Sequence, residues 1–429
     1  MFAVGAWIVP AAFFVFAIIL SCSHVNFCLL FCLIIFWAAG FGVFESLNFK
    51  YEQDNFLNMN CTICPRRCFI SAGKTGFCGV RRNMASMGVV QNNSIGGEVS
   101  GGIVGEGGGI FSVVYGKNTG FVVDPVEKKP LYHFYPGLRT LSFGSIGCNL
   151  DCKFCQNFSI SRSVDESILI AASPLEVVDV ARRNGCLGVA FTYNEPVIWL
   201  EYVIDIARAA RQAGLLTIAV TNGYITQEWQ EKFFENIDAA NVDLKSFSDN
   251  FYREYCSASI EPVKETLCFL AKKNRGKLGN IICNDNSKSN SNSRTWFEVT
   301  TLLIPELNDS EKEVEELADW ILSNLGAEVP LHFSAFRPAD RMRSIPPTPP
   351  RTLFKARDIA LAAGLKYVYT GNIDDQVGQS TFCPQCKQCV IVRDRFNVTE
   401  YHIDEDQCCC YCGQTIAGEF SENENEFKK

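Results

Sequence analysis

From residue 139 onward, short apolar runs alternate with longer segments in which apolar residues recur at helical spacing. The apolar runs have the length of strands, and the segments between them are long enough for helices. Strands that alternate with helices in this way form parallel β/α units, so the pattern predicts an α/β fold. The six predicted strands are residues 141–146, 188–193, 216–220, 240–244, 296–303 and 331–336. Residues 369–372 are expected to end a final strand, and no chemistry is assigned to them.

One predicted helix is marked at both ends. Residues 310–313, Ser-Glu-Lys-Glu, have the form of a capping box, in which Ser310 and Glu313 would each accept a backbone hydrogen bond. Gly326 stands where a helix commonly ends. Between these signals, apolar residues share one helical face at Val314, Leu317, Ile321 and Leu325.

The N-terminal 44 residues contain no Asp, Glu, Lys or Arg. They form two apolar runs, 2–20 and 25–44, and each is close to the roughly 20 residues that cross a bilayer. Basic residues follow the second run, which predicts a helical hairpin with the catalytic part in the cytoplasm. A cleaved signal peptide and a start codon assigned too far upstream are the alternatives.

The overall charge and the cysteine content narrow the function further. The formal charge is −8 and the pI is near 5.3, which disfavours the basic surface of non-specific nucleic-acid binding, so no nucleic-acid partner is expected. Most of the 21 cysteines fall in tight spacings typical of metal sites. Such spacings in a large α/β pattern indicate a reducing compartment.

Three cysteines, Cys148, Cys152 and Cys155, follow the first predicted strand with the spacing C-x3-C-x2-C. A protein-held [4Fe–4S] cluster normally takes four thiolates, and the next cysteine along the chain is Cys186, beyond a predicted helix. Three ligands would leave one iron open, which favours catalysis over simple electron transfer. Structural zinc is the alternative, although zinc sites usually pair two C-x2-C knuckles.

These residues and their flanks resemble the AmmeMemoRadiSam-system radical S-adenosylmethionine (SAM) enzymes, relatives of pyruvate formate-lyase activating enzyme. The resemblance rests on Phe154 before the last cysteine, on residues 124–134 (Asp-Pro-Val-Glu-Lys-Lys-Pro-Leu-Tyr-His-Phe) and on Cys155-Gln156-Asn157. It extends from about Cys61 to Gly418. It implies a partial (β/α)6 TIM-type radical SAM barrel with its function at the C-terminal strand ends.

The resemblance also implies the cofactors and their contacts. A [4Fe–4S] cluster would bind SAM at its open iron and cleave it to methionine and a 5'-deoxyadenosyl radical, which abstracts hydrogen from a substrate. The implied SAM-binding residues are Asn194, Glu195, Asn222, Asp243, Lys245 and His332. Tyr193 and Asn194 stand where the superfamily's Gly-Gly-Glu-Pro element has its two glycines.

Three of the candidate residues have a simpler reading beside the functional one. Asp243 and Lys245 share a strand face and could form only a salt bridge. A lone strand histidine such as His332 is more often merely hydrogen-bonded. His133, in the Leu-Tyr-His-Phe run, is a weaker candidate for a substrate or pocket role.

Two further cysteine groups have metal-binding spacings. The N-terminal group, spaced C-x2-C-x3-C-x9-C, offers four soft ligands to a metal that the sequence does not identify, and buried free thiols are the alternative. The C-terminal group has the paired C-x2-C knuckles of a zinc ribbon, with extra thiols at Cys389, Cys408 and Cys410 that leave the ligand choice open by one position. The two groups are Cys61, Cys64, Cys68 and Cys78, and Cys383, Cys386, Cys409 and Cys412.

These features divide the chain into predicted parts. They are a transmembrane hairpin (1–44), a Cys-rich knuckle and linker (45–138), the barrel (139–378), a zinc-ribbon-like module (379–418) and an acidic tail (419–429). Within them, the glycine-rich residues 92–109 predict a flexible loop, and the polar residues 277–294 predict a disordered insertion.

The leading hypothesis is a membrane-anchored radical SAM enzyme, an oxidoreductase resembling the activating enzymes of glycyl radical proteins. The resemblance implies a protein substrate, an electron donor of the flavodoxin or ferredoxin type, and Memo-type or AMMECR-type proteins as partners. The alternative is a non-catalytic metal-binding or RNA-binding scaffold. The acidic charge and the intact three-cysteine loop disfavour it.

Overall fold

The computed structural model describes residues 58–84, 102–105, 108–274 and 295–420. Its main feature is an eight-stranded sheet of order β15-β14-β13-β12-β11-β10-β8-β7, parallel throughout except for the pair β7 and β8. The predicted parallel α/β sheet is therefore confirmed. The strands are β7 (Val122–Pro125), β8 (Arg139–Phe143), β10 (Gly188–Phe191), β11 (Leu216–Thr221), β12 (Ala239–Asp243), β13 (Trp296–Leu303), β14 (Leu331–Ala335) and β15 (Val368–Gly371).

The sheet strands are apolar because both of their faces are covered. Strand β13 is buried along almost its whole length, as is typical of a parallel strand packed on both sides. Strand β15 is the final strand expected to end at residues 369–372, and β7 adds an antiparallel edge. The two edges, β7 and β15, do not pair with each other in the described residues, so the sheet is open.

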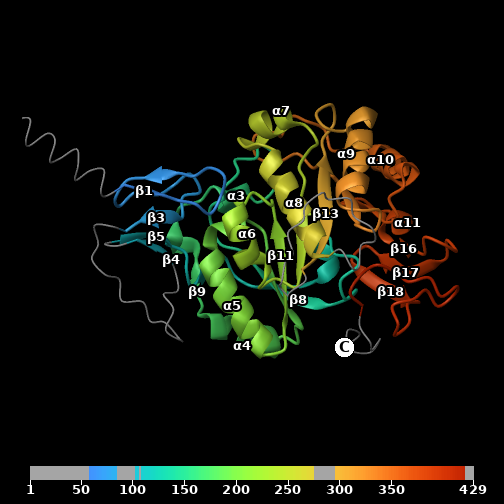
Figure 1. Ribbon diagram of the computed structural model, residues 1–429, viewed down its shortest axis with the longest axis horizontal. Helices are drawn as coiled ribbons and strands as arrows, with labels where there is room; N and C mark the ends of the chain where they lie inside the picture. The colour runs from blue at the N-terminus through green and yellow to red at the C-terminus, as the bar shows by residue number, and fades with distance from the viewer. Residues whose placement is uncertain (1–57, 85–101, 106–107, 275–294, 421–429) are drawn as a thin grey trace, which may run out of the picture. The chain divides into compact units, whose positions relative to one another are not determined.

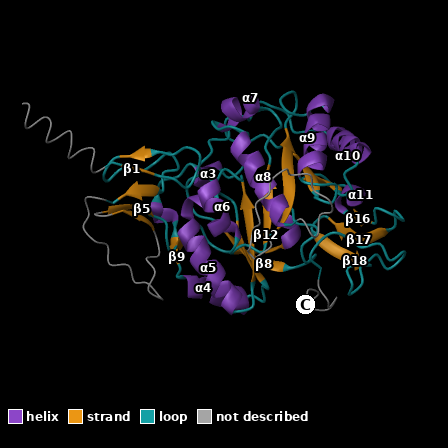
Figure 2. Ribbon diagram, viewed as in Figure 1, coloured by secondary structure: helices purple, strands orange, loops and turns teal. Residues whose placement is uncertain are grey.

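Helices connect the strands, and Figure 2 shows α4, α5, α6 and α8 along one side of the sheet. Helix α4 begins with a capping box in which Ser173 and Glu176 each accept the other's backbone N–H. The longer helices are α4 (Pro174–Arg183), α5 (Leu200–Gln212), α6 (Gln227–Phe234), α8 (Glu261–Lys273), α9 (Glu311–Asn324) and α10 (Pro350–Ala363). The shorter ones are α3 (Phe158–Ser161), α7 (Asp249–Phe251) and α11 (Gln376–Gln379), with a π-helix at Tyr252–Cys256.

Helix α9 has the predicted end signals with one change. Ser310 accepts the Glu313 N–H, and Gly326, with φ of 108°, follows the helix end. The Glu313 carboxylate does not return to Ser310 but accepts the Ser246 hydroxyl and the Phe247 N–H, at 2.9 Å for the latter. This glutamate therefore ties α9 to the loop after β12 instead of completing a capping box.

Smaller sheets flank the main one, as the colours of Figure 1 show by residue number. Near the N-terminus, β1 (Met59–Asn60) pairs with β2 (Phe69–Ile70), and β3 (Arg81–Asn83), β5 (Gly108–Ser112) and β4 (Gly102–Gly105) form a second sheet. The prediction of a flexible loop at 92–109 is thus wrong for the strand residues among them. Strands β6 (Lys117–Asn118) and β9 (Ile170–Ala171) also pair. The C-terminal ribbon consists of β16 (Thr381–Phe382), β17 (Cys389–Asp394) and β18 (Asn397–Tyr401).

The prediction of a membrane-anchored protein needs correction. None of the helices in the described part of the chain is both long and apolar enough to cross a bilayer. The hairpin predicted at residues 1–44, the insertion at 277–294 and the tail beyond residue 420 lie outside the described residues.

Candidate active site

A cleft of about 270 Å³ opens at the C-terminal ends of the parallel strands. Its walls contain the three cysteines of the β8–α3 loop together with polar residues that follow β10, β11 and β12. Of the six SAM-binding residues predicted, five line it: Asn194, Glu195, Asn222, Asp243 and Lys245. The parallel strand ends therefore bring together residues that are widely separated in the sequence.

Two of the three thiols of this loop lie beside polar groups. Cys148 Sγ accepts the Leu150 N–H at 3.4 Å and lies 3.9 Å from Asn222 Nδ2, and the Cys155 thiol lies 3.5 Å from Ser161 Oγ. Three cysteines from one loop that face a polar cleft are a donor set that fits a [4Fe–4S] cluster with one open iron.

Asn194 fixes the backbone that leads into Cys148. Its Oδ1 accepts the Ser145 N–H at 3.0 Å, and its Nδ2 donates to the carbonyl groups of Ile146 and Gly147 at 3.1 and 3.0 Å. Both N–H groups of the amide are used by these contacts. Asn194 therefore positions the cysteine loop.

Tyr193 occupies the first of the two positions at which the superfamily element has glycine. Its φ of 70° lies in the left-handed region, where a bulky residue is strained. The conformation is held at both ends, because the Tyr193 hydroxyl donates to Asp124 at 3.0 Å and Asn157 donates to the Tyr193 carbonyl at 2.7 Å. A tyrosine here keeps the backbone shape that glycine would adopt freely.

Glu195 joins the ends of β10 and β11. One carboxylate oxygen accepts the Val197 N–H at 3.0 Å and the Thr221 hydroxyl at 2.7 Å, and the other accepts the Asn222 N–H at 2.8 Å. The side chain is buried, and burial raises the pKa of Glu195 to about 7. Asn222 in turn donates from Nδ2 to Asn149 Oδ1 at 2.8 Å. Glu195 thus reaches the cysteine loop through Asn222.

Asp243 and Lys245, at the end of β12, form a salt bridge of 2.6 Å inside the cleft. Burial alone would lower the pKa of Lys245, but the charges of Asp243 and Cys152 outweigh it and raise that pKa above its usual range. The ammonium group therefore stays charged. Asp243 and Lys245 therefore form the salt bridge of the simpler reading, and they also line the cleft as the functional reading requires.

One cysteine beside the loop was missed from the sequence. The buried Cys256, in the π-helix after α7, hydrogen-bonds with the Cys152 thiol. This bond holds the pKa of Cys152 below its usual value, while burial raises the pKa of Cys256. A hydrogen bond from Cys256 therefore favours the ionised form of Cys152. Two backbone bonds, from the Asp151 and Lys153 N–H groups to the carbonyls of Cys256 and Tyr255, hold the segments together.

His332 does not line the cleft. It is buried deeper in the fold and lies 2.6 Å from Glu298 on the neighbouring strand β13. Glu298 also accepts the N–H groups of Tyr132 and His133 at 3.0 and 2.7 Å. This arrangement matches the simpler reading of a hydrogen-bonded strand histidine.

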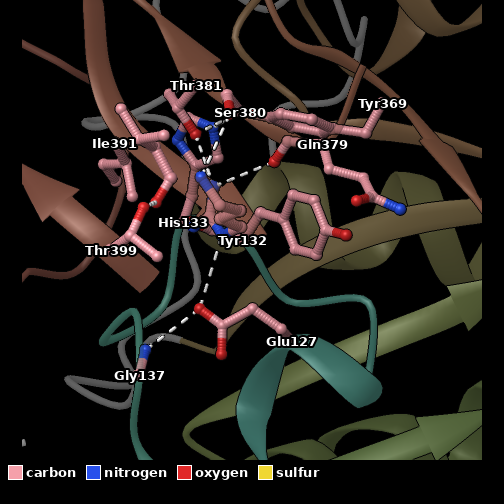
Figure 3. A network of polar contacts seen from close by, with 12 residues as sticks. Glu127, Tyr132, His133, Gly137, Tyr369, Gln379, Ser380, Thr381, Ile391 and Thr399 are labelled. Carbon is pink, nitrogen blue, oxygen red and sulfur yellow. Dashed lines mark hydrogen bonds and ion pairs between the residues drawn. The ribbon is translucent and has the colours of Figure 1, made fainter. Parts of the chain in front are cut away.

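His133 is also buried away from the cleft, in the polar network of Figure 3. Its Nδ1 pairs with the Ala417 carbonyl and its Nε2 with the Tyr369 hydroxyl, both at 2.5 Å. Burial lowers the pKa of His133 to about 4, so the ring is neutral. A substrate role for His133 is not supported, because its polar atoms are already bonded within the fold.

The same network attaches the C-terminal ribbon to the sheet. Arg393 of β17 is fully buried and lies 3.4 Å from the buried Glu127 carboxylate. The Oε1 atom of Glu127 also accepts the Gly137 N–H at 3.0 Å (Figure 3). Arg393 further donates to the Tyr132 carbonyl at 2.7 Å and to the Thr381 hydroxyl at 2.9 Å. Residues of the 124–134 motif thus connect the main sheet to the C-terminal ribbon.

The four predicted ribbon cysteines come together. Their sulfur atoms all lie within 4.8 Å of one another, with 3.6 Å between Cys383 and Cys412 and 3.7 Å between Cys386 and Cys409. A zinc ion with Zn–S bonds of about 2.3 Å requires sulfur atoms about 3.8 Å apart. The donor set therefore fits zinc, and the extra thiol Cys408 turns instead toward Asp406 and Thr415.

Known proteins share parts of this sequence. Residues 144–286 match the radical SAM superfamily. The chain is 38% identical over 374 residues to the uncharacterized protein MJ0808 of Methanocaldococcus jannaschii, covering 87% of this chain and 98% of that protein. It is 26% identical over 194 residues to a pyruvate formate-lyase-activating enzyme of Clostridium pasteurianum, covering 44% of this chain and 71% of the enzyme.

Among solved structures, a domain of a pyruvate-formate lyase-activating enzyme from Bacteroides vulgatus is similar with a TM-score of 0.35. The sequence identity is 18%, and the alignment covers 43% of this chain and 99% of that domain.

Proposed function

Because this chain belongs to the radical SAM superfamily, we propose that the cleft binds a [4Fe–4S] cluster and SAM and that the enzyme abstracts hydrogen from a polypeptide. The observation that carries the proposal is the convergence of Cys148, Cys152 and Cys155 with the polar strand ends in one cleft. When bound, the cluster supplies the electron that cleaves SAM to methionine and a 5'-deoxyadenosyl radical.

The residues of the chain have separate tasks in this proposal. Cys148, Cys152 and Cys155 would hold the cluster. Asn194 and Glu195 act as positioning residues, since their polar atoms bond to the loop backbone and to the neighbouring strand end.

The charged groups of Asp243 and Lys245 line the cleft, and the ammonium and carboxylate groups of a bound SAM would need partners of opposite charge there. Both charges can serve the one ligand because they lie side by side. The two residues therefore suit recognition of its amino-acid end. His332 has no role in this proposal.

The substrate class is the finer part of the proposal. Similarity to pyruvate formate-lyase-activating enzymes favours a protein substrate and an electron donor of the flavodoxin or ferredoxin type. The motifs at residues 124–134 and 155–157 favour the AmmeMemoRadiSam group, with Memo-type and AMMECR-type proteins as partners.

The test is anaerobic reconstitution with iron and sulfide, followed by SAM, a reductant and chromatography for 5'-deoxyadenosine. The wild-type chain should release 5'-deoxyadenosine, and replacing Cys148, Cys152 and Cys155 with Ala should abolish both the release and the iron held at this loop. Cys186→Ala is the matched control, because Cys186 is a buried cysteine outside the cleft. Equal iron and equal product in the triple variant would contradict the proposal.

We also propose that Cys383, Cys386, Cys409 and Cys412 hold structural zinc, on the strength of their sulfur spacing. Burial would raise the pKa of Cys383, but bonds from the N–H groups of Cys386 and Gln385 and from neighbouring thiols outweigh it and lower that pKa to about 7. A thiol that ionises this readily is a suitable zinc ligand. We also keep, as part of the proposal, the predicted domain boundaries after residue 138, where the barrel begins, and after residue 378, where the zinc-ribbon-like module begins.

A further inference from the structure

The N-terminal cysteine group, Cys61, Cys64, Cys68 and Cys78, lines a single small cavity. The Phe77 N–H donates to Cys68 Sγ at 3.5 Å, and burial raises the pKa of Cys61, Cys64 and Cys78 while backbone N–H groups of Ile63, Arg66 and Val80 oppose that rise. Sulfur atoms supplied with N–H donors are typical of thiolates that bind a metal centre. The arrangement therefore differs from four unrelated buried thiols.

A cation with an unused donor also borders the cavity. The Arg81 side chain is 2% exposed and lies 2.6 Å from Glu201, yet its Nε–H has no hydrogen-bond partner among the described residues. A buried N–H without a partner costs about 1–3 kcal/mol of free energy. An anionic group in the cavity would supply the missing acceptor and balance the guanidinium charge.

The spacing of the sulfur atoms distinguishes a site for a single zinc ion from a site for a larger iron–sulfur cluster. In the ribbon, four sulfurs lie within 4.8 Å of one another, whereas among the described residues neither the N-terminal four nor Cys148, Cys152 and Cys155 gather so closely. In a [4Fe–4S] cluster each thiolate binds its own iron, so the sulfurs stand farther apart than around a single ion. By this measure the N-terminal group resembles the radical SAM loop and differs from the ribbon.

The N-terminal group is also packed directly against that loop. A Cβ atom on Gly147, the residue before Cys148, would come within 2.2 Å of the Cys78 carbonyl oxygen, so only glycine allows this approach. The Arg66 guanidinium donates to the Asn149 carbonyl at 2.5 Å, and Asn149 itself lines the cavity. The backbones that carry Cys78 and Cys148 are therefore in contact.

We propose that Cys61, Cys64, Cys68 and Cys78 hold a second [4Fe–4S] cluster, which exchanges electrons with the cluster at Cys148, Cys152 and Cys155. The electron exchange rests on the proposed function, whereas the second cluster does not. One electron from a reduced iron–sulfur or flavin carrier would reduce the N-terminal cluster and then pass to the cluster at Cys148, Cys152 and Cys155, with each donor oxidised by one electron. No bond or proton needs to change in this transfer.

The metal content of the full-length protein tests the site. After anaerobic reconstitution, the wild-type chain should contain about eight iron atoms, and Cys64→Ser with Cys68→Ser should contain about four. The triple Ala variant at Cys148, Cys152 and Cys155 should also keep about four, which shows that the N-terminal cluster forms alone. Cys186→Ala should keep the wild-type amount.

The outcomes distinguish this proposal from the proposed function. If the N-terminal double variant lost zinc and kept all its iron, or lost neither metal, the second cluster would be refuted while the first stood. If instead the triple variant lost no iron, the proposed function would fail. Iron retained at the intact loop shows that each variant has folded.

Electron paramagnetic resonance tests the electron exchange. With both clusters reduced, the wild-type spectrum should show spin–spin broadening that is missing from each variant, because the two loops are in contact. A wild-type spectrum equal to the sum of the two variant spectra would refute the close pairing.

Discussion

Replacing Glu195 with Gln should change how stability depends on pH. The wild-type carboxylate accepts hydrogen bonds from three donors, which belong to Val197, Thr221 and Asn222. Gln keeps one acceptor oxygen, and its NH₂ group would face one of these donors. An unsatisfied buried donor costs about 1–3 kcal/mol, which should lower the free energy of unfolding at every pH.

The pH-dependent part of the difference in free energy of unfolding instead works against the wild type. Burial raises the pKa of Glu195 from 4.5 to about 7, so the folded state holds this proton more firmly than the unfolded state does. The resulting stability is fully present below pH 4.5 and is lost as the pH rises through about 7. Between pH 5 and 8 the wild type should therefore lose about 2.5 kcal/mol relative to Glu195→Gln.

Urea unfolding followed by circular dichroism, measured without oxygen at several pH values from 5 to 8, provides the two stability curves. The quantity to compare is the difference between the wild-type and variant free energies of unfolding at each pH. Glu265→Gln, which removes an exposed carboxylate from α8, should retain the wild-type loss assigned to Glu195. Parallel curves for wild type and Glu195→Gln would refute the burial argument.

Three further changes test other parts of the fold. Cys256→Ala should keep the cluster iron and the cleavage of SAM, because Cys256 serves as a hydrogen-bond donor to Cys152; loss of iron by metal analysis would instead make it a fourth ligand. Arg393→Met should lower the free energy of unfolding by about 3–5 kcal/mol in urea titrations, because it leaves the buried Glu127 without its partner; a change below about 1 kcal/mol would contradict this. Cys412→Ser should reduce zinc measured by mass spectrometry while iron stays constant, and unchanged zinc would move the site to another set of thiols.

The sequence predicted the sheet well because its strands are short, mostly apolar runs separated by helical segments. Strand β13 matches the predicted residues 296–303, and the polar residues after β10, β11 and β12 converge as parallel strand ends must. The spacing of the ribbon cysteines likewise anticipated four sulfurs in one place. In each case a short sequence pattern predicts a single local structure, a strand in the first case and a pair of metal-binding knuckles in the second.

Features that depend on distant contacts could not be predicted in this way. Cys256 reaches Cys152 only because the π-helix after α7 packs against the cysteine loop. His332 lies on the expected strand, but near its N-terminal end and away from the cleft, and the sequence does not show where along a strand the cleft begins. Glu127 and Arg393 would each be expected at the surface as single charges, and their burial depends on a partner far away in the chain.

The bond between Glu127 and Arg393 also constrains the order in which the chain can become stable during synthesis. Residue 127 leaves the ribosome long before residue 393, and a buried carboxylate without its cation is strongly unfavourable. The strands of the main sheet can pair as they are synthesised, but Glu127 gains its buried cation only after β17 has been translated. A ribosome that stops between residues 371 and 393 therefore releases a chain that has all the strands of the main sheet but leaves the buried Glu127 without Arg393.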